Sequence, residues 1–312
     1  MTALASTREE YGRTLVGLGQ RDPNVVVVGG DLNKSTFAHL FAQQFPQRFF
    51  DFGPAEQNIM SVAAGLASSG KTVFVNTFAV FATGRPFDQV RISIAQPHLN
   101  VKIVATHAGI TTGEDGISAQ GIEDLALMCS LPGLTVVVPA DAAEARAAVT
   151  MAAQTPGPFY IRLSRPATPV VYQGNCPFQL GRADLLRQGT DATIVACGVM
   201  VAVALEAAAA LATRGVQCGV LNVSTLSPVD TEALVGAARE TGAVVVAEEH
   251  LKHGGLGSIV ARVLGERCPA PLEQVALSGY AESGSPEALL EKYGLTAAQV
   301  IAAVHKAVAR KG

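Results

Sequence analysis

Short runs of consecutive apolar residues alternate with helical patterns along most of the chain. The first half predicts strands at Val25–Val28, Thr72–Val75, Val101–Ala105, Thr135–Val138 and Phe159–Leu163. Between them the periodicity predicts helices at about Thr7–Leu18, Glu56–Ser69, Pro86–Ala95, Ala119–Ser130 and Asp141–Ala153. Strands that are apolar at every position must be buried on both faces, as in parallel sheets with helices on each side. The sequence therefore predicts an α/β fold of three layers.

The alternating pattern stops near residue 175 and then restarts. Residues 164–183 are rich in Pro and Gly, and further strands are predicted within residues 192–198, 216–226 and 243–250. Helices are predicted at residues 201–213, 231–239 and 255–263. A chain of 312 residues is long for one core and suits two. We therefore predict two parallel-sheet domains, residues 1–170 and 187–312, joined by a linker at 171–186.

Composition limits the possible partners and compartments. The net charge of −3 gives no electrostatic reason to expect nucleic acid or an anionic membrane as a partner. Hydrophobic residues make up 49% and charged residues 16%, which suggests that another subunit covers part of the surface. Five scattered cysteines without a CxxC pair argue against a disulfide framework and a zinc site. With neither a signal peptide nor a membrane-spanning run recognisable, we expect a cytoplasmic protein.

Three segments that follow predicted strands carry side chains suited to a ligand site: residues 29–36, 76–91 and 106–127. Loops at the carboxyl ends of parallel strands meet at one edge of the sheet, where ligands bind. Taken singly, their aromatic, histidine and acidic residues also fit ordinary core and turn positions. Glu56, at the start of an apolar helix, equally fits a simple interaction with the helix dipole. Their combined order favours a site.

This order of motifs resembles a known family. The segments AEQN, TFAVF with FDQVR, THAGI with GEDG, and PAD occur as in the pyrimidine-binding half of transketolases, and the C-terminal domain of those enzymes follows. The resemblance covers essentially the whole chain. It implies an enzyme that uses thiamine diphosphate to move a two-carbon ketol unit between sugars.

The resemblance assigns residues to the cofactor. Glu56 matches the family's activating acid, which hydrogen-bonds a pyrimidine nitrogen and makes the cofactor's own amino group basic enough to remove a proton. Phe81 matches the residue that stacks on the pyrimidine ring, with Phe78 beside it. Asp31, in GGDLN after a predicted strand, is a further candidate contact. Gly84 stands where the family often carries another aromatic residue.

The substrate side is only partly preserved. The residues that hold the acceptor's phosphate in the family fall on Arg8, Ser35, His107 and Arg165, and His107 is also a candidate catalytic residue. Two arginines suit a phosphate, although both could instead be ion-pair partners. Asp115 matches an acid that hydrogen-bonds a sugar hydroxyl. Ala119 stands where a histidine normally contacts the donor, so the donor differs, a partner supplies the group, or activity is reduced.

The family's diphosphate-binding half carries a GDG motif followed by a distant Asn, and this sequence has no such pair. A diphosphate without a metal or a basic cradle binds poorly. We therefore predict a split enzyme, in which this chain holds no metal and a separate N-terminal subunit supplies the Mg²⁺ ligands. The cofactor would lie between the subunits, and we expect a heterotetramer that acts on a small sugar substrate.

Three other functions remain open. The chain could be the β-subunit of a 2-oxoacid dehydrogenase decarboxylase, a deoxyxylulose-phosphate-synthase-like enzyme, or a non-catalytic regulatory subunit. The THAGITTGEDG and TFAVF segments favour the transketolase side, and the two arginines suit phosphosugar chemistry. Intact Glu56, Phe81 and Asp115 argue against a non-catalytic role.

Overall fold

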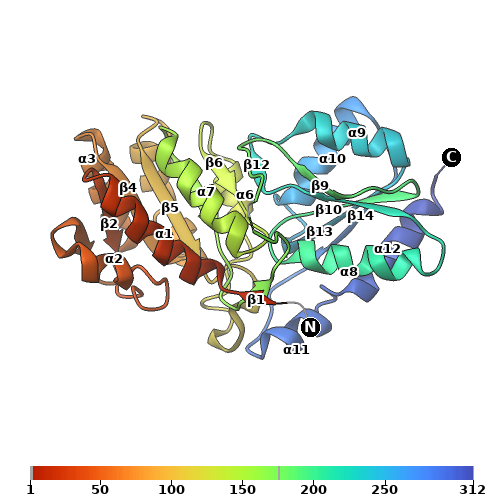
Figure 1. Cartoon of the computed structure of the whole chain (residues 1–312), viewed down its shortest axis with the longest axis horizontal. Coiled ribbons are helices and arrows are strands. Elements are labelled where there is room, and N and C mark those ends of the chain that lie inside the picture. The colour runs from red at the N-terminus through yellow and green to blue at the C-terminus, as the bar shows by residue number, and fades with distance from the viewer. Residues whose placement is uncertain (1–2, 175, 312) are drawn as a thin grey trace.

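The computed structural model describes residues 3–174 and 176–311, which form two large sheets covered by helices on both faces (Figure 1). The first sheet has seven strands in the order β12 (Thr225–Ser227), β6 (Thr135–Val137), β7 (Phe159–Arg162), β5 (Val101–Thr106), β4 (Thr72–Phe78), β2 (Val25–Gly29) and β3 (Phe49–Asp51). The second has the order β14 (Leu272–Leu277), β13 (Val244–Leu251), β10 (Ala192–Ala196), β11 (Cys218–Asn222) and β9 (Asp184–Arg187). A small antiparallel pair joins β1 (Leu4–Ala5) to β8 (Thr168–Pro169).

Helices complete the layers. Those of the first half are α1 (Thr7–Arg21), α2 (His39–Gln44), η1 (Pro46–Arg48), α3 (Glu56–Ser68), α4 (Ala79–Thr83), α5 (Phe87–Gln89), η2 (Val90–Ala95), η3 (Ile110–Asp115), α6 (Asp124–Cys129) and α7 (Ala142–Gln154). Those of the second half are α8 (Met200–Ala212), α9 (Thr231–Thr241), α10 (Leu256–Arg267), α11 (Pro286–Lys292) and α12 (Ala297–Val308). None of the helices in the described residues is long and apolar enough to span a membrane.

The apolar strands explain this layering. On one face of the first sheet, α1 and α7 bury Leu15 and Val149 against Val27 and Ile161. On the other face, Ile59 of α3 belongs to a hydrophobic cluster that continues into the second sheet. In that second sheet α8 and α12 pack on one face, while α9 and α10 cover the other (Figure 1). The predicted α/β fold with two sheets is confirmed, whereas the proposed limits of the domains and linker stay a prediction.

The structure differs from the predicted elements in several places. Two edge strands, β9 and β12, run antiparallel to their neighbours. The single strand predicted within residues 216–226 is in fact β11 and β12, which belong to different sheets. The helix predicted at Ala119–Ser130 was wrong at its start, because α6 begins only at Asp124. Gly121 bridges instead to Ala108, and it packs so closely on Ala79 that a Cβ there would lie 2.8 Å from the Ala79 Cβ.

A buried ion pair connects the two sheets. The Nε of Arg162, at the end of β7, lies 2.8 Å from the Oδ2 of Asp124, and both side chains are almost fully buried. Tyr160 also donates a hydrogen bond to Asp124, and Arg162 donates one to the carbonyl of Glu249 in β13. Burial alone would raise the pKa of Asp124, but the charge and hydrogen bonds of Arg162 hold it below its usual value.

We predict that Asp124→Asn lowers the free energy of unfolding by about 3–5 kcal/mol, because Arg162 would keep a buried charge without its counter-ion. Urea unfolding measures the change. The matched control is Asp88→Asn, which breaks an exposed pair with Arg91 and should change stability by less than about 1 kcal/mol. Equal losses in both variants would contradict the prediction.

Candidate active site

The predicted site residues follow the carboxyl ends of neighbouring strands of the first sheet. Because β3, β2, β4, β5 and β7 run parallel, their carboxyl ends lie along one edge. The residues that follow these ends are Glu56 after β3, Asp31 and Ser35 after β2, Phe81 after β4, His107 and Asp115 after β5, and Arg165 after β7. Phe78 is the last residue of β4, and Arg8 lies in the first turn of α1.

Glu56 is a buried carboxylate, with only 6% of the residue exposed. It is the first residue of α3, so its charge lies where the helix dipole favours an anion. Its Oε1 accepts a hydrogen bond of 2.9 Å from Nη1 of Arg85, whose side chain is 54% exposed. No motif in the sequence points to Arg85. The sequence offers one indication: Arg85 directly follows Gly84, which stands where the family often carries an aromatic residue.

Three rings and a guanidinium group form a continuous stack that ends at Glu56. The His107 ring lies 3.6 Å from the Phe78 ring, centroid to centroid, with an angle of 16° between planes. The Phe78 and Phe81 centroids are 5.8 Å apart, at 12°. The guanidinium of Arg85 lies 4.3 Å from the Phe81 centroid. The structure thus brings Glu56, Phe78, Phe81 and His107 together.

His107 is buried, and its ring is fixed by its neighbours. Its backbone is left-handed, with φ of 56°, and its carbonyl accepts a hydrogen bond from the Thr112 hydroxyl. The ring Nδ1 lies 2.8 Å from the Thr106 hydroxyl. Burial, together with the positive charges of Arg8 and Arg165, lowers the pKa of His107 to about 3. The imidazole is therefore neutral at physiological pH and can act as a hydrogen-bond donor or acceptor.

The two arginines are held in place mainly by backbone carbonyls. Arg8 donates hydrogen bonds of 2.8 Å to the carbonyl of Arg165 and 2.7 Å to that of Ser35. Arg165 donates to the Thr112 carbonyl and to the carboxylate of Glu114, each at 2.7 Å. The alternative interpretation as an ion-pair partner thus applies to Arg165, which pairs closely with Glu114 and more distantly with Asp115. Ser35 contacts Arg8 through its carbonyl and not through its hydroxyl.

The acidic candidates lie on the surface. Asp115 is exposed, and its Oδ1 lies 3.9 Å from Nη2 of Arg165. Asp31 is also exposed, with a left-handed φ of 51°, and its N–H donates to the Asp51 carboxylate. Burial and the charges of Asp51 and Glu56 raise the pKa of Asp31. Asp31 and Ser35 line one cavity of about 350 Å³.

Residues of the second half of the chain form hydrogen bonds with the loop that follows β5. Glu249, at 3% exposure, accepts a hydrogen bond of 2.6 Å from the N–H of Thr111. Gly109 has φ of 78°, and any Cβ there would collide with the Glu249 carboxylate. Further along the loop, Gln120 donates to the carbonyl of Glu282. Glu249 could not be identified from the sequence, because nothing local in the strand pattern shows what its carboxylate contacts.

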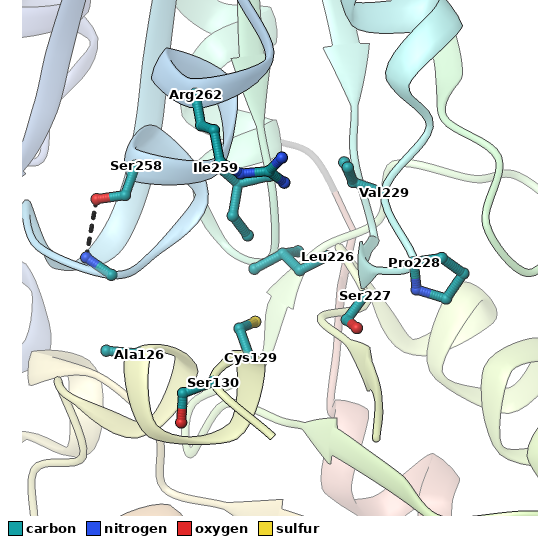
Figure 2. A pocket seen from close by; sticks show the side chains of 11 residues that line it. Ala126, Cys129, Ser130, Leu226, Ser227, Pro228, Val229, Ser258, Ile259 and Arg262 are labelled. Carbon is teal, nitrogen blue, oxygen red and sulfur yellow. Dashed lines mark hydrogen bonds between the residues drawn. The ribbon is translucent and has the colours of Figure 1, made fainter. Parts of the chain in front are cut away.

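A separate cavity of about 450 Å³ lies between α6, α10 and the segment around β12 (Figure 2). Its lining includes Cys129 and Arg262 but none of the predicted site residues. Burial and nearby carboxylates raise the pKa of the Cys129 thiol to about 12, so the thiol is unreactive at neutral pH.

The donor set of the site suits a planar nitrogen heterocycle. A buried carboxylate, Glu56, lies beside an aromatic ring, Phe81, and both already contact one planar cation. A protonated ring nitrogen makes the same kinds of contact, so these residues fit the pyrimidine part of thiamine diphosphate. Within residues 3–174 and 176–311, no group of three or more His, Cys, Asp or Glu side chains is placed to hold a metal ion.

The chain matches two family models. Residues 4–170 match the family model for the pyrimidine binding domain of transketolase, and residues 181–300 match that for the C-terminal domain of transketolase. The chain is 44% identical over 305 residues to the 6-deoxy-6-sulfo-D-fructose transketolase subunit SqwH of Clostridium sp. (strain MSTE9), covering 97% of this chain and 95% of that protein. It is 38% identical to transketolase-like protein 2 of Mus musculus, covering 98% of this chain but 49% of that protein.

Among solved structures, the chain is similar to one described as a split gene transketolase, inactive beta4 tetramer. The TM-score is 0.91 at 52% sequence identity, and the match covers 99% of this chain and 100% of that chain.

We predict that His107 stays neutral from neutral pH down to about pH 4, because its pKa is about 3. Below the ordinary value of 6.5, His107 of the unfolded chain binds a proton that His107 of the folded chain does not bind. The free energy of unfolding therefore keeps its full contribution from His107 above pH 6.5 and loses it progressively as the pH falls toward 3. Its ring proton signals in an NMR titration measure the pKa. Arg8→Met should raise that pKa by removing a nearby cation, and Arg13→Met, which removes an exposed arginine paired with Glu9, should not. A wild-type value near 6.5 would refute the prediction.

Proposed function

The chain belongs to the transketolase family, and we propose that it is the C-terminal subunit of a split, thiamine-diphosphate-dependent enzyme that transfers a two-carbon ketol unit between sugars. The observation that carries the proposal is the placement of the buried Glu56 carboxylate beside the Phe81 ring, at the strand ends of the first sheet. Coverage of the relatives supports a split enzyme, because the chain spans nearly all of SqwH and about half of transketolase-like protein 2.

Glu56 and Phe81 would hold the pyrimidine end of the cofactor. Bound thiamine diphosphate supplies the carbon centre that carries the ketol unit. Glu56 would accept a hydrogen bond from the ring nitrogen, and its burial strengthens this bond because little water screens the charge. Phe81 would fix the orientation of the ring by stacking, and Phe78 lies nearly parallel to Phe81. Asp31 is close enough to Glu56 for the two charges to interact.

Arg8 and Arg165 would bind the anionic end of the sugar substrate. Both charges act on His107, so the three side chains form one positively charged region with a neutral imidazole in it. Guanidinium groups suit phosphate, and they also suit the sulfonate named for the SqwH relative. We propose a sugar that carries one of these groups. Asp115, next to Arg165, would accept a hydrogen bond from a sugar hydroxyl, and Ser35 would act by holding Arg8.

On the proposed donor side of the site, one residue, Ala119, differs from the family. Ala119 is buried and offers only a methyl group, and the side chain of its neighbour Gln120 is bound to the Glu282 carbonyl. We propose that the partner subunit supplies the missing donor contact. The partner subunit would also supply the ligands of Mg²⁺, which a bound diphosphate requires. We further propose a heterotetramer with that partner subunit, since the solved split-gene relative without other subunits is named an inactive beta4 tetramer. We also propose a cytoplasmic location, which the free thiols of all five cysteines support.

Reconstitution tests the proposal. The chain, assembled with its diphosphate-binding subunit, should bind thiamine diphosphate in the presence of Mg²⁺ and transfer a ketol unit from a phosphorylated or sulfonated ketose to an aldose phosphate. Calorimetry measures binding, and a coupled assay follows the ketol transfer. Decarboxylation of pyruvate without ketol transfer would indicate the β-subunit of a 2-oxoacid dehydrogenase instead. An assembled enzyme that binds no thiamine diphosphate would refute the cofactor assignment.

We predict that Glu56→Gln lowers the turnover of the assembled enzyme by at least about 100-fold, because an amide cannot assist the proton shift of the ring. Thermal unfolding should change little, since Gln has nearly the same shape. The matched control is Glu232→Gln, which also removes a first-turn carboxylate paired with an arginine, Arg267. Near wild-type turnover of the Glu56 variant would remove the basis of the assignment.

A further inference from the structure

Arg85 contacts both side chains that the proposed function assigns to the cofactor ring. Its Nη1 donates a hydrogen bond of 2.9 Å to the Glu56 carboxylate, and its guanidinium lies 4.3 Å from the centre of the Phe81 ring. A guanidinium is flat, positively charged and carries N–H donors at its edge. A protonated aminopyrimidine has the same three properties. The two groups therefore make the same kinds of contact with Glu56 and Phe81.

Phe78 and Arg85 both pack near the Phe81 ring, and they differ in how far they are exposed. Phe78 precedes it by three residues and Arg85 follows it by four, so the two lie toward opposite ends of the helical turn around Phe81. Phe78 is nearly parallel to Phe81 and also packs on His107, which makes it part of a buried stack. Arg85 is the half-exposed member. A ring that stacks on Phe81 where the guanidinium now lies, within reach of Glu56, must therefore displace Arg85.

The ion pair with Arg85 also opposes the chemistry proposed for Glu56. The Oε1 of Glu56 already accepts a hydrogen bond from Arg85, so the guanidinium occupies the carboxylate that the ring nitrogen would need. The activating role requires Glu56 to share a proton with the ring nitrogen. Glu56 thus serves that role best when Arg85 has moved away.

From these contacts we infer that Arg85 is a built-in competitor of the cofactor: it occupies Glu56 and Phe81 and leaves them when the aminopyrimidine ring binds. This inference rests on the proposed function. It adds a residue that sets how tightly and how fast the cofactor is bound, and it gives Arg85 no part in the chemical step.

The surroundings of Arg85 allow this movement. Helix α4 ends at Thr83, and Gly84 and Arg85 lie beyond it at the surface. The carbonyl of Arg85 accepts a hydrogen bond from the side chain of Gln57, so the backbone stays in place while the side chain moves. The exposed carboxylate of Asp31 already interacts with the charge of Arg85. Burial and the acidic neighbours raise the pKa of Asp31, and the charge of Arg85 partly offsets this rise. Asp31 offers the displaced guanidinium a new partner.

The test compares cofactor binding by three forms of the assembled enzyme: wild type, Arg85→Met and Arg91→Met. Arg91 is the matched control, because it is exposed to the same extent and pairs with Asp88. Calorimetry with thiamine diphosphate and Mg²⁺ should give a Kd about three- to tenfold lower for Arg85→Met, with faster association in stopped flow. The factor corresponds to one partly exposed ion pair and one cation–π contact that no longer have to be broken. Arg91→Met should bind like wild type.

A double variant shows whether the competition acts through Glu56. In the Glu56→Gln background the ion pair is already lost, so Arg85→Met should lower the Kd by a clearly smaller factor than in the wild type. An unchanged or higher Kd for Arg85→Met, while the wild type binds the cofactor, would overturn the inference and leave the proposed function standing. A fall in kcat of Arg85→Met at an unchanged Kd would also overturn the inference, because it would show that Arg85 positions Glu56 for catalysis. Failure of the wild-type assembly to bind thiamine diphosphate would reject both.

Discussion

A carboxylate buried at the start of a helix needs a cation or a strong hydrogen-bond donor beside it, and this need shapes the whole cofactor side of the site. Glu56 gains part of its stabilisation from the dipole of α3 and part from Arg85. The same need makes the position selective for a flat, cationic ligand. Phe81 adds a surface on which such a ligand can stack, so charge and shape favour the same class of molecule.

The charges of the site are separated along the strand ends. Asp51 ends β3, and Asp31 and Glu56 follow β2 and β3, where the charges of Asp51 and Glu56 act on Asp31. Arg8 and Arg165 lie on the other side of the Phe78 stack, near His107. The acidic side suits the cationic ring of the proposed cofactor, and the basic side suits the anionic end of the proposed sugar. The aromatic side chains of Phe78 and Phe81 lie between the two charged groups.

The sequence was sufficient for the architecture, because uniformly apolar strands can be buried only in a helix-covered sheet. It also placed the site residues on loops that converge, since the carboxyl ends of parallel strands share an edge. It could not give the direction of the edge strand β12 or its pairing with β6, because apolar runs report burial and not strand direction. It also missed the start of α6, where the close approach of Gly121 to Ala79 overrides the helical period. The contact between Arg85 and Glu56 joins two segments that no local pattern connects.

The second half of the chain takes part in the site through one strand. Burial raises the pKa of Glu249 in β13 to about 6, yet its carboxylate is fixed by the Thr111 N–H and the charge of Arg162. Arg162 in turn donates to the backbone carbonyl of Glu249, so β13 holds both the loop after β5 and the end of β7. His107 and Arg165 follow these same strands. The loop that carries His107 therefore owes its shape to contacts from both sheets, and the two halves of this chain form the proposed substrate site as one unit.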